Sequence, residues 1–149
     1  MTLRIIGYGT KAYHQMVALR YDVLLKPLGR KFTDEELAKD KKDLMVGHYD
    51  AKDQINGCCI MSDETTNPNV KTGRFRQMAV HDPLQRQGIG RKVLTYSEDI
   101  ARRNGYHLLT MNSRKTAVPF YEKCGYKVCS EEFKSGITGL LHLKMKKQL

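Results

Sequence analysis

The sequence predicts a single domain of the α/β (α+β) class, with elements in the order β-α-α-β-β-β-α-β-α-β-β. Two observations carry this prediction. The apolar run Phe75–Val80 leads through a loop with two glycines, Gln85–Gly90, into the most regular helical pattern of the chain, Gly88–Asn104. Short strand-like runs, separated by turn residues, lie on both sides of this unit. At 149 residues the chain can bury one core without a disulfide or a metal.

The first third of the chain predicts one strand and two helices. Residues 3–7 form a short, partly β-branched run that ends in glycine, as expected of a strand. Apolar residues then recur at helical spacing from Thr10, a candidate N-cap, towards the terminator Gly29. A second, short helix is expected over 34–42, because Thr33 is a hydroxyl cap and acidic residues fill the first turn.

The middle of the chain predicts three strands. Residues 44–49 and 54–62 flank the polar stretch 50–53, which is a hairpin turn by its length and composition. The stretch 63–72 contains Asn-Pro-Asn and is expected to be a loop. Residues 73–81 then form the third strand, which ends at Asp-Pro because proline cannot donate to a sheet ladder.

The last third predicts a strand, a helix and two final strands. Residues 106–111 are apolar and follow the long helix. The next helix is expected to begin late, with a cap at Thr116 and an end at Gly125, because the proline in this segment is tolerated only in a first turn. Residues 126–133 and 139–146 are expected to form two antiparallel strands.

The chain is basic, with a formal net charge of +10, so anions are attracted over a wide pH range. Nucleic acid is one such anion. A protein that binds it is expected to interleave exposed aromatic residues with basic ones, whereas the tyrosines here are scattered and tryptophan is absent. A nucleic-acid partner is therefore not favoured.

The cysteines and the hydropathy pattern indicate the cellular compartment. The four cysteines show neither a metal-ligand spacing nor a secreted framework, and Cys58 and Cys59 should point to opposite faces of a strand. No apolar stretch reaches 18 residues, and the amino terminus lacks an export signal. We therefore expect a cytoplasmic protein with reduced thiols, no metal and no membrane segment.

The loop Gln85–Gly90 is the candidate binding element. A strand, a glycine loop and a helix in this order present free backbone N–H groups at the positive end of a helix dipole, where a pyrophosphate can bind. Two common phosphate loops do not fit. A P-loop needs lysine and then a hydroxyl residue after Gly90, where Arg91 and Lys92 stand, and a dinucleotide fingerprint needs a third glycine at Val93.

The loop does fit Gln/Arg-x-x-Gly-x-Gly/Ala, and so resembles the coenzyme A loop of the GNAT N-acetyltransferase superfamily. Residues 117–126 resemble a second motif of that superfamily, Ala-x-x-Phe-Tyr-Glu-Lys-x-Gly-Phe/Tyr. The resemblance implies the GNAT fold, a mixed, mostly antiparallel twisted sheet of about seven strands with about four helices on both faces. It also implies that the fourth and fifth strands splay apart and that acetyl-CoA is the co-substrate.

A splay leaves backbone groups of the fourth strand without a partner inside a sheet. The resemblance implies that the pantetheine arm of acetyl-CoA pairs with them, and that main-chain N–H groups of the loop hold the pyrophosphate. The arginines of the loop would add charge-assisted contacts, although they fit a solvated surface equally well. The cofactor-binding residues implied in this way are Met78, Ala79, Val80, Gln85, Arg86, Gln87, Gly88, Ile89, Gly90 and Arg91.

Tyr121 matches the tyrosine with which the family protonates the leaving thiolate. A phenol keeps its proton at neutral pH and can donate it; the alternative is a packed core tyrosine beside Phe120. The sequence does not identify the general base. Relatives often place a glutamate on the fourth strand, where residues 74–77 are Arg-Phe-Arg-Gln, so His81, Glu64 and a water chain are the candidates.

Arg114 stands where many relatives have asparagine, and is a further candidate cofactor residue. The form Asn-Ser-Arg-x-x-Ala-x-x-Phe-Tyr resembles the bacterial ElaA-like small acetyltransferases. So does the late element Gly136-Ile137…His142-x-x-Met145. Arg114 is then expected to face a cofactor phosphate or an acidic substrate.

The leading hypothesis is therefore an acetyl-CoA-dependent N-acetyltransferase that acts on a small amine or on an exposed protein amine. The alternative is a non-catalytic CoA-binding or nucleic-acid-binding module on the same fold, which the basic charge and the missing base allow. The acceptor is not identified, because the first two helices and the last hairpin carry no motif. A homodimer is possible, since family members often pair through their last strands.

Overall fold

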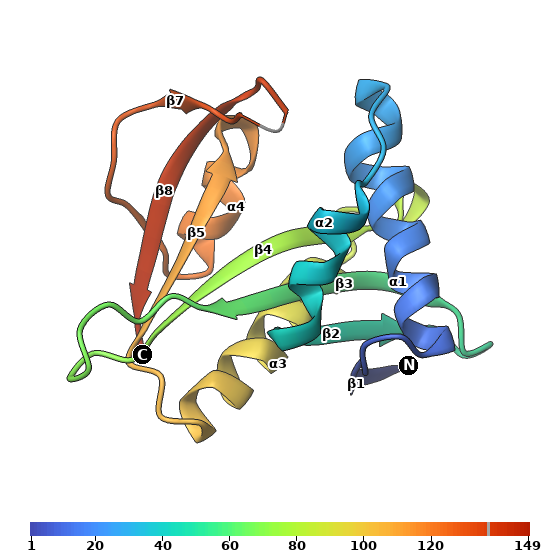
Figure 1. Ribbon diagram of the computed structural model, residues 1–149, viewed down its shortest axis with the longest axis horizontal. Helices are drawn as coiled ribbons and strands as arrows, with labels where there is room; N and C mark the ends of the chain where they lie inside the picture. The colour runs from blue at the N-terminus through green and yellow to red at the C-terminus, as the bar shows by residue number, and fades with distance from the viewer. Residues whose placement is uncertain (137) are drawn as a thin grey trace.

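One eight-stranded twisted sheet forms the centre of the computed structural model, which describes residues 1–136 and 138–149 (Figure 1). The strands are Thr2–Ile5 (β1), Leu44–Tyr49 (β2), Ile55–Asp63 (β3), Thr72–Val80 (β4), Leu108–Arg114 (β5), Lys127–Val128 (β6), Phe133–Lys134 (β7) and Leu141–Gln148 (β8). Their order is β1-β2-β3-β4-β5-β8-β6, and β7 also pairs with β8. Only β4 and β5 run parallel among the described pairs, which confirms the mixed, mostly antiparallel sheet.

Helices cover both faces of the sheet, as predicted. The helices are Lys11–Arg20 (α1), Asp34–Ala38 (α2), Ile89–Arg103 (α3) and Val118–Lys123 (α4). Figure 1 shows α1 and α2 in front of the sheet and α3 behind it. Each face has its own hydrophobic cluster, one that includes Met16 of α1 and one that joins Val93 of α3 to Tyr121 of α4.

Adjacent cysteines separate these two clusters. Cys58 packs with the α1 cluster and Cys59 with the α3 cluster, because successive strand residues point to opposite faces. Both thiols are free and buried, and burial raises the pKa of Cys58 to about 12. They are core residues, not nucleophiles.

The first helical segment has the predicted extent, but only Lys11–Arg20 is α-helical. The Thr10 hydroxyl accepts a hydrogen bond from the Tyr13 N–H, which confirms the cap. After Arg20 the chain continues as a π-helical turn, in which the Lys26 N–H bonds back to the Tyr21 carbonyl. A 3₁₀ turn then ends at Gly29, which has φ +66°.

The second helix and the hairpin agree with their predicted positions. Thr33 and Glu36 form a capping box at the start of α2, which continues as a 3₁₀ turn over Lys39–Lys42. Strands β2 and β3 pair across the predicted turn, with a register shift between His48 and Tyr49. In the described part of the chain, no helix is long and apolar enough to cross a membrane.

The carboxyl-terminal third differs from the prediction at the strand over 126–133 and at the cap of α4. A single strand over 126–133 is wrong: only the two-residue strands β6 and β7 form, and the Ser130 hydroxyl between them accepts from the Lys144 N–H. Thr116 is not the cap of α4, because a 3₁₀ turn comes first and Ala117 takes the N-cap position without a side-chain hydrogen bond. Ile137, part of the late element named above, lies outside the described residues.

Strand β5 is displaced towards the carboxyl end. It was predicted over 106–111 and runs over Leu108–Arg114. Residues as far as Arg114 therefore belong to the strand, and Arg114 lies opposite His142 of β8. Gly125 has φ +94° and follows the C-cap of α4, as predicted.

Candidate active site

Strands β4 and β5 pair only along their first halves. The parallel register runs from Thr72 beside Leu108 to Phe75 beside Met111 and stops there. Beyond this point the two strands diverge, as Figure 1 shows. The described strands leave one edge of β4 without a partner from Arg76 onwards, so the predicted splay is present.

A cleft of about 590 Å³ lies in this opening. Its lining comes from the π-helical turn after α1, from both diverging strands, from the glycine loop, from α4 and from the segment that contains β7. The cleft therefore reaches both faces of the sheet. The lining residues used below are Arg74, Arg76, Met78, Val80, Gln85, Arg86, Gly88, Gly90, Asn112, Arg114, Tyr121 and His142.

A β-bulge shapes the β4 side of the cleft. Cys58 pairs with Ala79 but Ile60 pairs with Arg76, so β4 carries one extra residue at this point. Gln77 has φ +56°, a left-handed backbone that is unusual for a residue with a side chain. At the bulge, β4 leaves its regular register with β3 next to the cleft.

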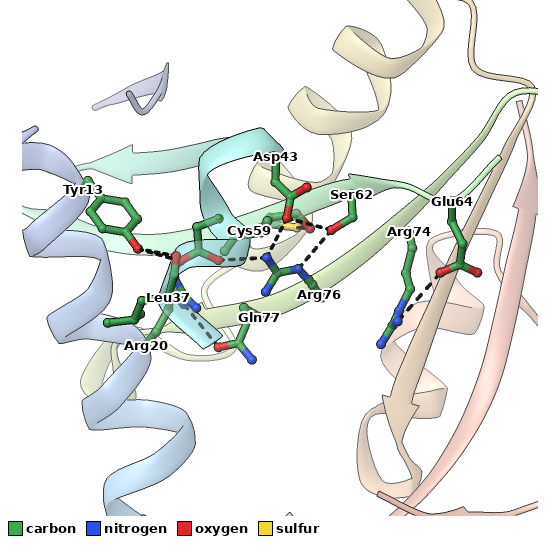
Figure 2. A network of polar contacts seen from close by, with 12 residues as sticks. Tyr13, Arg20, Leu37, Asp43, Cys59, Ser62, Glu64, Arg74, Arg76 and Gln77 are labelled. Carbon is green, nitrogen blue, oxygen red and sulfur yellow. Dashed lines mark hydrogen bonds and ion pairs between the residues drawn. The ribbon is translucent and has the colours of Figure 1, made fainter. Parts of the chain in front are cut away.

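A buried polar network holds the bulge from the α1 and α2 side (Figure 2). Arg20 donates from Nε to Gln77 Oε1 at 3.2 Å and from a terminal nitrogen to Asp40 at 2.8 Å. The Tyr13 hydroxyl donates to the same carboxylate at 2.7 Å. Arg20 and Asp40 are both fully buried, so each neutralises a charge that would otherwise be costly to bury.

The network continues to the residue next to the bulge. Arg76 donates to Asp40 at 2.8 Å, to Asp43 at 2.6 Å and to the Ser62 hydroxyl at 3.0 Å. Burial alone would lower the pKa of Arg76, but the hydrogen bonds to Asp43 and Asp40 raise it above its usual value. Arg76 is thus a cation whose charge is balanced by the carboxylates of Asp40 and Asp43.

The glycine loop presents an open helix amino terminus. Helix α3 begins after Gly88, which has φ +82°, and no side chain caps it or places an acid in its first turn. Its first N–H groups are left for an external acceptor. Gln85 fixes the loop, because its side-chain amide donates to the Val80 carbonyl at 3.0 Å and to Asp82 at 2.8 Å.

The structure brings most of the predicted site residues to the cleft. Those that line it are Met78, Val80, Gln85, Arg86, Gly88, Gly90, Arg114 and Tyr121. Ala79 and Ile89 belong instead to the two hydrophobic clusters, and the side chains of Gln87 and Arg91 are exposed outside the lining. These four residues are not among those that line the cleft.

Tyr121 lies on the wall of the cleft opposite β4. Its side chain is only 9% exposed and packs edge-on against Phe120 and Tyr126. Burial raises its pKa, so the phenol keeps its proton at neutral pH. The described residues offer the Tyr121 hydroxyl no hydrogen-bond partner, which leaves it available to a ligand.

The sequence matches the family described as an acetyltransferase (GNAT) domain over residues 19–149. The chain belongs to the GNAT acetyltransferase family. An uncharacterized N-acetyltransferase of Chlorobaculum tepidum, CT2212, is 29% identical over 102 residues, which is 66% of this chain and 59% of that protein. Matches to the curated relatives cover from 8% to 59% of their own length.

Solved GNAT structures share the whole fold. ElaA of Escherichia coli superimposes with a TM-score of 0.79 over 98% of both chains, at 10% identity. A GNAT acetyltransferase of Elizabethkingia anophelis, solved with acetyl-CoA bound, has a TM-score of 0.72 over 99% of this chain and 97% of its own, at 19% identity. At these identities the likeness concerns the fold.

The predicted candidates for the general base of this GNAT domain do not line the cleft. Glu64 lies 3.8 Å from Arg74, and His81 is exposed beyond the end of β4. His142 of β8 does line the cleft. Its Nδ1 lies 2.9 Å from the Leu140 carbonyl, and because a carbonyl only accepts, Nδ1 carries the proton and Nε2 is the free acceptor.

The sequence did not indicate His142 as a candidate for the base, because the position of β8 beside β5 does not follow from a local pattern. A signal was present in the late element His-x-x-Met, which the resemblance singled out without a chemical role. The pairing of His142 with Arg114 depends on the position of β8 between β5 and β6. Within the described residues, no group of His, Cys, Asp and Glu gathers that could hold a metal ion.

Proposed function

We propose that this GNAT protein transfers the acetyl group of acetyl-CoA to a primary amine of a small molecule or a protein. One observation carries the proposal: a single cleft joins the unpaired edge of β4, the open amino terminus of α3 and the Tyr121 hydroxyl. These are a backbone edge, an anion site and a proton donor. A thioester of coenzyme A needs all three.

The chain's own residues fit the co-substrate in shape and charge. The edge of β4 at Met78–Val80 offers backbone groups to the pantetheine amides. The first N–H groups of α3 would meet the pyrophosphate, with Arg86 beside them. A Cβ at Gly90 would stand at ordinary contact distance, 3.5 Å from Phe120 and 3.6 Å from Val80, two residues that line the cleft.

Acetyl-CoA supplies the thioester, and the residues of the cleft move the protons. The amine nitrogen forms a bond to the carbonyl carbon while the carbon–sulfur bond breaks. We assign Tyr121 as the general acid that gives its phenol proton to the leaving sulfur, and His142 Nε2 as the base that takes a proton from the amine. Transfer is direct, because no cysteine is among the residues that line the cleft.

Two measurements test the proposal. Calorimetry in the presence of a chelator should show acetyl-CoA binding at one site per chain. Gly90→Val should weaken this binding at least about tenfold, because branched methyl groups would fill the space above the loop. Gly105→Ala is the matched control: Gly105 has φ +82° at the far end of α3, so this change strains the fold without approaching the cleft.

The second measurement is release of CoA in the presence of a broad panel of amines. Acetylation of at least one amine is expected. If acetyl-CoA does not bind, the proposed function is wrong. If it binds but no amine reacts, the non-catalytic CoA-binding alternative replaces it.

A further inference from the structure

Two buried polar atoms at the closed end of the splay have no partner. Arg74 Nε and Thr110 Oγ1 are both buried, and neither makes a hydrogen bond to a described residue. Arg74 of β4 lies directly beside Thr110 of β5 in the parallel register. Buried polar groups in folded proteins are nearly always paired, so these two neighbouring exceptions mark an unsatisfied polar position next to the cleft, which Arg74 lines.

This pair lies on the face of the sheet that carries α1 and α2. Side chains of neighbouring residues in a parallel pair share a face, and alternate residues of a strand do so too. Arg74, Thr110, Asn112 and Arg114 therefore share one face. Phe75 and Met111 occupy the other face, in the cluster around α3.

Three arginines of this face line the cleft, and two of them, Arg74 and Arg114, lie outside the polar network around the bulge. The network around the bulge is neutral in itself, since Arg20 and Arg76 are matched by Asp40 and Asp43. Arg74 has only Glu64, at 3.8 Å and partly exposed, as an opposite charge (Figure 2).

Arg114 makes a single long hydrogen bond, 3.5 Å, to the Leu24 carbonyl. Among the described residues that line the cleft there is no Asp or Glu. This face of the cleft therefore combines two cations, and the one opposite charge near them is Glu64, which lies outside the lining.

We infer that the acceptor is an amine that also carries an anionic group, a carboxylate or a phosphate, and that Arg74 binds this group with Arg114 as the second cation. An anion in the cleft can accept charge-assisted hydrogen bonds from the Arg74 guanidinium, which lines the cleft and has an unsatisfied Nε. The inference rests on the proposed function and adds the substrate class to it.

Matched pairs of amines test this class. The pairs are 4-aminobutyrate with 4-aminobutyramide, and phosphoethanolamine with ethanolamine. Binding of each compound to the protein loaded with CoA is measured by calorimetry, and acetyl transfer by kcat/KM. At least one anionic member should bind and react at least about tenfold better than its neutral partner, because hydrogen bonds to a charged group contribute that much.

Three variants connect the preference to Arg74. Arg74→Gln should remove the preference for the anionic member, and Arg74→Lys should keep part of it. Glu64→Gln should increase the preference, because it removes the competing carboxylate. Arg103→Gln, an exposed arginine at the end of α3, is the matched control and should change nothing.

The outcomes separate the two proposals. If acetyl-CoA does not bind, the proposed function fails. If it binds and neutral amines bind or react as well as their anionic partners, or if no anionic amine binds at all, the inference about the acceptor is wrong while the cofactor site stands. If Arg74→Gln weakens acetyl-CoA binding and leaves the preference unchanged, Arg74 belongs to the cofactor site and the inference is wrong as well.

Discussion

Arg20 reaches from α1 to donate a hydrogen bond from Nε to the side-chain oxygen of Gln77 at 3.2 Å, and Gln77 is the residue of β4 with a left-handed backbone. Holding a residue with a side chain at φ +56° has an energetic cost that its surroundings must offset. The buried guanidinium provides that anchor, because it is itself fixed by Asp40. The bulge beside the cleft is therefore tied to α1 through Arg20.

Replacing the Gln77 side chain should show how much this anchor contributes. Gln77→Met keeps the volume but leaves Arg20 Nε buried without an acceptor, so we expect a loss of about 1–3 kcal/mol in the free energy of unfolding. Gln77→Glu keeps an acceptor oxygen and should be close to the parent. Urea denaturation measures both variants. Equal stability of the parent and the methionine variant would show that the bulge holds itself.

The same network predicts how stability depends on pH. Burial would raise the pKa of Asp40, but hydrogen bonds from Arg20 and Tyr13 outweigh it and lower the pKa below its usual value. A carboxyl with a depressed folded pKa stabilises the protein above its unfolded pKa, near 3.9. That contribution is lost as the pH falls through the folded value.

Asp40→Asn should therefore be most damaging at neutral pH. It removes the charge that pairs with Arg20 and should lower the free energy of unfolding by about 3–5 kcal/mol at pH 7. The difference from the parent should shrink as the pH falls below about 4 and through the depressed pKa of folded Asp40, because the parent carboxyl then takes up its proton. Asp99→Asn breaks an exposed pair with Arg102 and, as a control, should change stability by at most about 1 kcal/mol. A difference that stays constant with pH would contradict the ionised state assigned to Asp40.

The sequence predicts those parts of this site that are local in the chain. The glycine loop, the start of α3 and the position of Tyr121 each follow from residues within one or two turns of each other, and the splay follows from the family resemblance. The bulge network does not, because Asp40 and Arg76 lie 36 positions apart and neither leaves a local pattern. The π-helical turn after Arg20 was also not predictable, since its apolar residues fit α-helical spacing.

His142 is expected to act only in the transfer step. His142→Gln keeps a polar side chain but has no basic nitrogen, so kcat/KM should fall by about 10²–10⁴-fold while acetyl-CoA affinity is unchanged. His107→Gln is the control, because His107 is exposed and outside the lining of the cleft. If His142→Gln reacts as fast as the parent, water carries the amine proton.

Tyr126 is the control residue for the assignment of Tyr121 as the general acid. Both are buried in the same cluster, but the Tyr126 hydroxyl donates to Glu98 at 2.7 Å, whereas the Tyr121 hydroxyl meets the cleft. Tyr126→Phe leaves the buried Glu98 with Lys147 as its remaining partner. That change should lower the free energy of unfolding by about 1–3 kcal/mol and leave the turnover of the folded protein unchanged.

Tyr121→Phe should lower turnover and leave the stability of the protein unchanged. The phenylalanine keeps the ring that packs against Phe120 and Tyr126, so the melting temperature and the acetyl-CoA affinity should stay close to those of the parent. Turnover should fall by about 10²–10⁴-fold, the usual contribution of a general acid, because the departing sulfur no longer receives a proton. Equal turnover with any reactive amine would show that Tyr121 is a core residue and that water protonates the thiolate. A lowered melting temperature would instead mean that the hydroxyl supports the fold, since a proton donor that acts only on the leaving group contributes nothing to stability before the reaction begins.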